Sequence, residues 1–277
     1  MPFRSRSLHL GYTPAELANS PYAPYYRPQL APLPPHVQAA LLTGPVAPEL
    51  LPPLARAADL LQDGHQAVET GYALCPDGSG RVHVLTGMPG VTPAMWAWWF
   101  GWHGSDPMRY KLWHPRAHLH VGWADGRSDL SHHIGRVSRV VEYIGAQRLS
   151  LSIAFVAPRA LGLDEALLQA RGEVAICARV GFDHTLLDTG WVLHHLRPTA
   201  DGCEMRSRFW AGGRHVSLRG LRVTDPLTRR VARWVQPIQA QQAADLLVHC
   251  AQEMQHLAAF LPELYARFGP SDALASA

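Results

Sequence analysis

The sequence predicts an α+β fold in which one long C-terminal helix closes a curved antiparallel sheet. Strand-like runs follow one another at short intervals between residues 80 and 210, a pattern typical of antiparallel sheets. Residues 239–268 have helical periodicity that is interrupted near Pro262. Because the sheet and the helix bury their apolar sides against each other, we expect the helix to cover the concave face, an arrangement that can leave an internal cavity.

The N-terminal part of the chain is rich in proline. The first 60 residues hold 12 of the 23 prolines, and this density forbids long regular elements. Only two short helices are expected there, at 37–42 and 53–61. We therefore divide the chain into a proline-rich, partly helical segment at 1–75 and a domain at 76–277. The segment can serve as a dimer interface or lie on the surface without a partner, and composition does not separate the two.

Alternation and capping signals predict the elements that follow. Residues 80–86 alternate like a strand, and Thr92-Pro93 are the N-cap and first turn of a helix that carries the aromatic run 96–100. The Asp201-Gly202 pair is a hairpin signal. Further strands are expected at 118–123, 135–144, 148–156, 172–180, 190–197 and 203–210.

The composition excludes several classes of protein. It is ordinary for a globular protein, with 47% hydrophobic and 17% charged residues. The 25 basic residues are scattered and barely outnumber the 22 acidic ones, which argues against a nucleic-acid partner. No apolar run approaches the roughly 20 residues that span a bilayer, and no signal-peptide pattern follows Met1, so we expect a cytoplasmic protein. The four cysteines form no Cys-x-x-Cys pair that would indicate a thiolate cluster or a redox motif.

The most unusual stretch lies between residues 96 and 133. It holds six of the nine tryptophans and six of the 16 histidines. Indole rings beside closely spaced imidazoles indicate a water-poor pocket with metal ligands in or near it. Pro115 keeps His114 out of the helical region, and a turn over 115–117 would bring His118 close to it. The two histidines are either half of a zinc site or structural residues, and His120 is a rival because it shares a strand face with His118.

Three further residues have the right chemistry for a metal site. Alternation places Glu142 on one face with Val140 and Ile144, where an ionised carboxylate needs a cation unless that face is a solvated edge. His249 and Glu253 lie one turn apart at the edge of the apolar stripe of the C-terminal helix, where they bind a metal together or simply cover buried surface. Two histidines and two carboxylates would make a zinc-like set.

Five motifs together resemble the diacetylphloroglucinol hydrolase and phloretin hydrolase family. They are Trp98-Trp99-Phe100-Gly101-Trp102-His103, Arg109-Tyr110-Lys111-Leu112-Trp113-His114-Pro115-x-x-His118, Val141-Glu142-Tyr143, Met205-Arg206-Ser207-Arg208-Phe209-Trp210 and His249-Cys250-x-x-Glu253-Met254. The likeness covers residues 84–265. It implies a Bet v 1-like helix-grip fold, an N-terminal segment used in homodimerisation and one Zn²⁺ per chain. The ligands it implies are His114, Glu142, His249 and Glu253, with His118 as the substitute for one of them.

The resemblance also implies an activity. Family members hydrolyse the carbon–carbon bond between a hydroxylated aromatic ring and an acyl carbonyl, so we expect an enzyme that acts on a small aromatic ketone. In the diacetylphloroglucinol enzyme an asparagine three residues after the first histidine ligand holds a ring hydroxyl. Ala117 has that position here, which implies a different hydroxylation pattern. Two alternatives stay open, namely a non-catalytic carrier of aromatic or lipid ligands and a hydrolase or cyclase of cyclic 1,3-diketones.

Cleavage of this bond also requires a proton for the departing ring carbon. The candidate proton carriers are Tyr110, His103, His194 and His195. Arg206 and Arg208 are candidates for pairing with a phenolate or oxyanion, and Trp99, Trp113, Ala117 and His118 for contacting the ring. Each has a structural alternative, such as packing, alternation across a strand or an ion pair.

Overall fold

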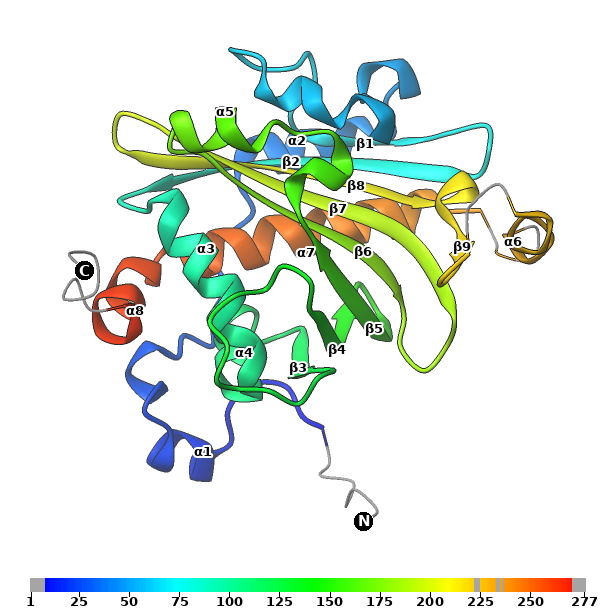
Figure 1. Cartoon of the computed structure of the whole chain (residues 1–277). Coiled ribbons are helices and arrows are strands. Elements are labelled where there is room, and N and C mark those ends of the chain that lie inside the picture. Colours follow the sequence, from blue (N-terminus) through cyan, green and yellow to red (C-terminus); the bar gives the residue numbers. More distant parts are fainter. Residues whose placement is uncertain (1–7, 222–224, 233–234, 236, 271–277) are drawn as a thin grey trace.

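The computed structural model describes residues 8–221, 225–232, 235 and 237–270, and its architecture is α+β (Figure 1). These residues form a nine-stranded sheet with the order β1-β2-β8-β7-β6-β5-β4-β3, in which β9 pairs with β7. All neighbouring strands are antiparallel. The strands are β1 (Gly71–Leu74), β2 (Ser79–Pro89), β3 (His118–Trp123), β4 (Val137–Ile144), β5 (Gln147–Val156), β6 (Val174–Phe182), β7 (Leu187–Pro198), β8 (Gly202–Gly212) and β9 (Ser217–Leu218).

The sheet curves around the helix α7 (Ala240–Ala258), which lies across its concave face (Figure 1). This is the helix-grip arrangement that the sequence predicts. The expected single helix over 239–268 is two helices, because α7 ends at Ala258 and α8 (Leu261–Phe268) begins with Pro262 in its first turn. Proline has no N–H to donate to the preceding turn, so the helical hydrogen bonds stop there.

The predicted strands and the capped helix are confirmed within a few residues at their ends. The hydroxyl of Thr92 accepts from the Met95 amide at the start of α3 (Pro93–Trp102). Thr199 and Gly202 close the β7–β8 hairpin through a backbone hydrogen bond of 2.9 Å. The sequence reading missed α4 (Pro107–Trp113), which Asp106 caps by accepting from the Met108 amide. It also missed β1, so the expected boundary after residue 75 would separate β1 from its partner strand β2.

The N-terminal segment wraps around the domain and takes part in its core. Tyr12, Tyr22 and Val37 are buried in the main apolar core, and residues 50–61 lie over the convex face of the sheet (Figure 1). The helix expected at 53–61 is 3-10 and irregular at Arg56. The elements here are α1 (Pro14–Asn19), η1 (Ala23–Tyr25), α2 (Pro35–Thr43), η2 (Pro48–Leu50) and η3 (Leu54–Leu61). The expected segment and domain also include 1–7 and 271–277, which lie outside the described residues.

Two apolar clusters form the core. The larger one lies between the concave face, α7 and the helices α3 and α4. The smaller one packs η3 against the convex face, together with η5 (Pro158–Leu161) and α5 (Glu165–Ala170). Short elements elsewhere are η4 (His103–Ser105), η6 (Gly213–His215) and α6 (Pro226–Ala232). In the described parts of the chain, no helix combines the length and apolar character that crossing a membrane requires.

Candidate metal centre

Four buried side chains converge between the sheet and α7. His118 opens β3 and is the register partner of Glu142 on β4, so strand pairing brings these two together. His249 and Glu253 lie one turn apart on α7, which crosses the same place. The His118 Nε2 atom lies 3.5 Å from Glu142 Oε2 and 3.4 Å from Glu253 Oε2. The His249 Nε2 atom lies 3.9 Å and 3.7 Å from the same two oxygens.

These separations fit a small divalent cation. Zinc bonds of about 2.1 Å in a tetrahedron place neighbouring ligand atoms about 3.4 Å apart. His118, Glu142 and His249 also form a group whose ligand atoms all lie within 4.8 Å of one another. The Nδ1 atom of His118 lies 2.9 Å from the Tyr110 carbonyl oxygen, which can only accept, so Nδ1 carries the proton. The buried Nε2 then has a free lone pair, and it has no hydrogen-bond partner among the described residues.

The electrostatics of the four groups also favour a cation. Burial lowers the pKa of His118 well below its ordinary value and that of His249 to about 4. Burial raises the pKa of Glu142 to about 7, and burial together with the charge of Glu142 raises the pKa of Glu253 well above its usual range. Two neutral imidazoles therefore face two carboxyl groups that resist ionisation beside each other, and a divalent ion bound among them would balance the negative charges of both.

His114, the first ligand that the resemblance implied, does not join this group. Its Nε2 atom lies 3.3 Å from Gln252 Oε1, and its ring stacks on the His249 ring at 5.2 Å. The expected turn does form, since the His114 carbonyl accepts from the amides of Ala117 and His118. However, His114 ends α4 on one side of the turn, whereas His118 enters the sheet on the other. The structure thus brings His118, and not His114, together with Glu142, His249 and Glu253.

A cavity of about 460 Å³ lies between the sheet and α7, and Glu142, His249 and Glu253 form part of its wall. Most of the lining is apolar. Of the other expected site residues, four line this cavity, namely Tyr110, His103, Trp113 and His194. Its apolar wall includes Phe100, Val140, Leu151, Phe155, Ile176 and Phe209. A flat apolar ligand would fit such walls.

Tyr110 connects the cavity to the candidate metal group, which is the set of four side chains of His118, Glu142, His249 and Glu253. Its hydroxyl donates a hydrogen bond to Glu142, and its ring stacks on the His118 ring at 3.8 Å with an interplanar angle of 3°. Burial and the charge of Glu142 raise the pKa of the phenol well above its ordinary value, so the hydroxyl keeps its proton at neutral pH. Tyr110 therefore holds His118 in place through its ring and presents a protonated hydroxyl beside Glu142.

Two histidines present neutral rings to the cavity. The Nδ1 atom of His103 lies 2.8 Å from the Trp99 carbonyl oxygen, and that of His194 lies 2.8 Å from Ser207 Oγ. Burial lowers the pKa of His103 to about 4 and that of His194 to about 3. Both rings are therefore uncharged at neutral pH, where they can accept or donate a hydrogen bond.

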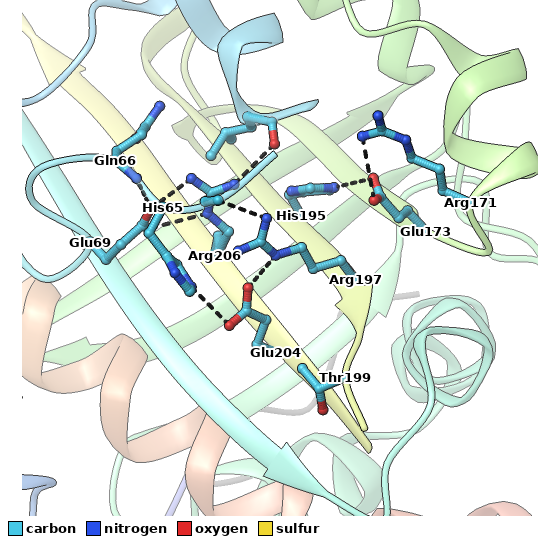
Figure 2. A network of polar contacts seen from close by, with 12 residues as sticks. His65, Gln66, Glu69, Arg171, Glu173, His195, Arg197, Thr199, Glu204 and Arg206 are labelled. Carbon is cyan, nitrogen blue, oxygen red and sulfur yellow. Dashed lines mark hydrogen bonds and ion pairs between the residues drawn. The ribbon is translucent and has the colours of Figure 1, made fainter. Parts of the chain in front are cut away.

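His195, Arg206 and Arg208 lie on the opposite, convex face, away from the cavity. The His195 Nε2 atom is 2.8 Å from Glu173 Oε2, and Arg206 pairs with Glu69 (Figure 2). Arg208 also pairs with Glu69. Neighbouring residues of a strand point to opposite faces, so His194 and His195 cannot both reach the cavity. Ion pairs beneath the N-terminal segment therefore use these three side chains. The structure does not bring them to the cavity, where His195 was expected as a proton carrier and the two arginines as partners of a phenolate or oxyanion.

Trp99 and Ala117 also lie outside the cavity lining. Trp99 is fully buried behind it, stacked on His103 at 5.4 Å and edge-on to Trp113 at 6.0 Å. It supports cavity residues rather than touching a ligand. Ala117 lines a second pocket of about 330 Å³ on the far side of His249. The sequence reading also missed Asp245, although its spacing of four from His249 was a usable signal.

Comparisons with known proteins converge on one group. The family model described as "DAPG hydrolase PhiG domain" matches residues 50–266. The 2,4-diacetylphloroglucinol hydrolase of Pseudomonas protegens is 30% identical over 268 residues, which are 92% of this chain and 87% of that protein. The phloretin hydrolase of Eubacterium ramulus is 31% identical over 256 residues, which are 88% of this chain and 89% of that protein.

Similar solved structures share little sequence with this chain. The crystal structure of Ara h 8.0201 has 13% identity and a TM-score of 0.32, and the match covers 65% of this chain and 99% of that one. Major latex-like protein 151 of Panax ginseng has 11% identity and a TM-score of 0.30, covering 62% and 97%. Because these TM-scores are low, the fold assignment rests on the order of the strands and the position of α7.

Proposed function

This chain belongs to the DAPG hydrolase family, and from that premise we propose that it hydrolyses the carbon–carbon bond between a polyhydroxylated aromatic ring and an acyl group. The products would be a carboxylic acid and a phenol. The observation that carries this proposal is the convergence of two imidazoles and two carboxylates on the wall of an apolar cavity. A non-catalytic carrier would have no use for buried carboxylates, which are costly to ionise without a cation.

We also propose one Zn²⁺ per chain, held by His118, Glu142, His249 and Glu253. The support is the spacing of the ligand atoms and the free Nε2 atom of His118. When bound, zinc supplies a Lewis acid that polarises a carbonyl oxygen or lowers the pKa of a water.

The protein's own groups would manage the protons. Hydrolysis adds a hydroxyl group to the acyl carbon and a hydrogen to the ring carbon as the bond between those carbons breaks. The Tyr110 hydroxyl keeps its proton and lies against Glu142, so we assign this pair to the proton transfer towards the ring carbon. Trp113 and the other apolar walls would exclude water from the phenolic ring while the proton moves.

The ring hydroxyls need polar partners in the same cavity. If His118 is the first ligand, the position three residues later, where the diacetylphloroglucinol enzyme has its asparagine, is Val121. Val121 is a buried residue of β3, and its side chain cannot form a hydrogen bond. His103 and His194 are neutral and line the cavity, so we assign the ring hydroxyls to them. The aryl ketone should therefore differ in hydroxylation from the substrate of the diacetylphloroglucinol enzyme.

A panel experiment tests the proposal. The zinc-loaded protein is incubated with 2,4-diacetylphloroglucinol, phloretin and a cyclic 1,3-diketone, and the released acid and phenol are measured by chromatography. We expect acid and phenol in equal amounts from at least one acylphenol. Fully loaded protein that releases acid only from the diketone, or from nothing, would rule out hydrolysis of acylphenols.

A matched pair of variants tests the ligand set. His118→Ala should lose zinc, whereas His114→Ala should keep it, because only His118 directs a free nitrogen at the two carboxylates. Metal analysis of the purified variants measures this directly. Zinc retained in His118→Ala and lost from His114→Ala would restore the set implied by the sequence resemblance.

We further propose that the protein is a cytoplasmic homodimer in which the N-terminal segment contributes to the interface. The side chain of Leu42 on α2 supports this, since it is 90% exposed although leucine is usually buried. Light scattering should give the mass of a dimer for wild type and a lower average mass for Leu42→Lys, because the substitution weakens the dimer. A monomeric wild type at micromolar concentration would contradict the proposal.

A further inference from the structure

The pocket on the far side of His249 adjoins the cavity. Asp245 and His249 line both spaces, so these two side chains of α7 form the wall between them. The rest of the second pocket differs from the apolar cavity, because many of its groups are polar. Its lining comprises residues 30–33, His114, Arg116, Ala117, Tyr143, Gly145, Val248 and Gln252.

We propose that this second pocket is a polar entrance to the metal centre, through which water arrives and the small carboxylic acid leaves. The inference rests on the proposed function. It assigns separate routes to the two kinds of molecule that the reaction handles. The aryl ketone and the phenol use the apolar cavity, and the polar molecules use the pocket beside His114.

The reaction itself calls for such a route. Each turnover consumes one water and forms one carboxylic acid, and both are polar. While an aryl ketone fills the cavity, the apolar walls leave these molecules without hydrogen-bond partners, which makes the path unfavourable. The second pocket offers polar groups among its lining residues. His114 Nδ1 is buried and has no hydrogen-bond partner in the described parts of the chain, which makes it a site for an ordered water.

The turn between β4 and β5 packs against one of the two side chains that line both spaces. Gly145 has φ +59°, and a Cβ atom there would overlap the carboxylate of Asp245. The backbone of the β4–β5 turn therefore lies directly against this side chain. Gln241 donates a hydrogen bond of 2.8 Å to Asp245 Oδ1, and this contact is at the exposed end of α7. A change of the Asp245 rotamer alone would move a wall residue shared by the pocket and the cavity.

The charges around the pocket suit a small acid. Arg116 is exposed at the rim, and its guanidinium attracts a carboxylate. Asp245 is the opposing charge, and it lies at the inner wall, where it would push a product carboxylate outwards. His114 is neutral, because burial lowers its pKa to about 3, and so it adds no charge between the two.

The test uses acetate as the probe and cobalt(II)-substituted protein, whose visible absorption reports ligands that reach the metal. Ala31 is exposed and lines the pocket, so Ala31→Trp should obstruct it, and Ala160→Trp at an exposed position of η5 is the matched control. With phloroglucinol filling the cavity, acetate should still bind to wild type. Ala31→Trp should slow acetate association by about tenfold or more, and Ala160→Trp should not.

A second variant does not depend on added bulk. Arg116→Ala should slow acetate association severalfold at low salt, and Arg116→Lys should restore most of the rate, because the attraction is electrostatic. The inference would be overturned if acetate associated at equal rates with wild type, Ala31→Trp and Arg116→Ala, and if phloroglucinol blocked acetate binding completely. If acetate behaves as expected but no acylphenol is cleaved, the proposed function fails while the entrance stands. A chain that binds no metal would overturn both.

Discussion

Replacing Glu69 with glutamine should destabilise the fold by roughly 3 kcal/mol, because two buried guanidinium groups would lose their shared counter-charge. Glu69 accepts hydrogen bonds of 2.6 Å and 3.1 Å from Arg206 (Figure 2), and it also pairs with Arg208. Both arginine side chains are only 1% exposed, so water cannot replace the carboxylate. The loss would loosen residues 62–70, which Glu69 ties to the convex face of the sheet.

The pKa of Glu69 gives the size of this loss of stability. Burial alone would raise it, but the hydrogen bond from Arg206, the charge of Arg208 and the Gln66 amide lower it to about 2 from an ordinary 4.5. At 1.36 kcal/mol per pKa unit this corresponds to roughly 3 kcal/mol. It agrees with the cost of about 3–5 kcal/mol for breaking a buried ion pair. Because the pKa is lowered, the contribution is complete above about pH 4.5 and is lost as the pH falls towards 2.

Urea unfolding followed by tryptophan fluorescence measures the effect, with the exposed Glu49→Gln as the control. At pH 7 the midpoint of Glu69→Gln should shift strongly, and the difference from wild type should shrink at pH 3. Zinc content should not change, because the network lies on the opposite face of the sheet from the metal group. A loss of less than about 0.5 kcal/mol at pH 7 would refute the reasoning, since surface substitutions commonly reach that size.

Four further predictions concern the candidate metal group. Zinc affinity should fall by about tenfold per pH unit below the Glu142 pKa of about 7, because protons compete for that carboxylate. A zinc affinity that stays constant from pH 8 to 5 in calorimetric titrations would contradict this. Metal-free protein should show the opposite trend, since a raised carboxyl pKa stabilises the fold most below about pH 4.5 and this contribution is lost by about pH 7. Tyr110→Phe should keep zinc and lower kcat by about 10²-fold or more, and an unchanged kcat would exclude it as the proton donor. Chelation should lower the unfolding temperature by roughly 5–10 °C, whereas an unchanged temperature would mean that the site was empty.

Much of the fold was predictable because each element carries its own periodic signal. The alternation around Glu142 placed this carboxylate on an inward face beside Val140, and the cavity lining agrees. The stripe on α7 placed His249 and Glu253 at the same helix edge, where the structure brings them together. By contrast, α4 has no apolar periodicity of its own, and only the caps at Asp106 and Pro107 marked it.

The errors over His195, Arg206 and Arg208 share one physical cause. A strand pattern separates residues into two faces, but here both faces are covered, one by α7 and one by η3. Arg206 and Arg208 are therefore as buried as a cavity residue would be, although they lie on the outer side. His194 and His195 are adjacent in the sequence, so their side chains point to opposite faces of the sheet. Only the tertiary structure decides which of these faces borders the cavity.

The sequence by itself determined where most strands and the closing helix lie along the chain and which residue types are available for a candidate metal group, because local periodicity and capping encode them. Only the tertiary structure decided which histidine completes that group. His114 and His118 are joined by one short turn, and nothing local distinguishes them. The pairing of β3 with β4 and the crossing of α7 place His118 Nε2 opposite two carboxylates and leave His114 beside Gln252.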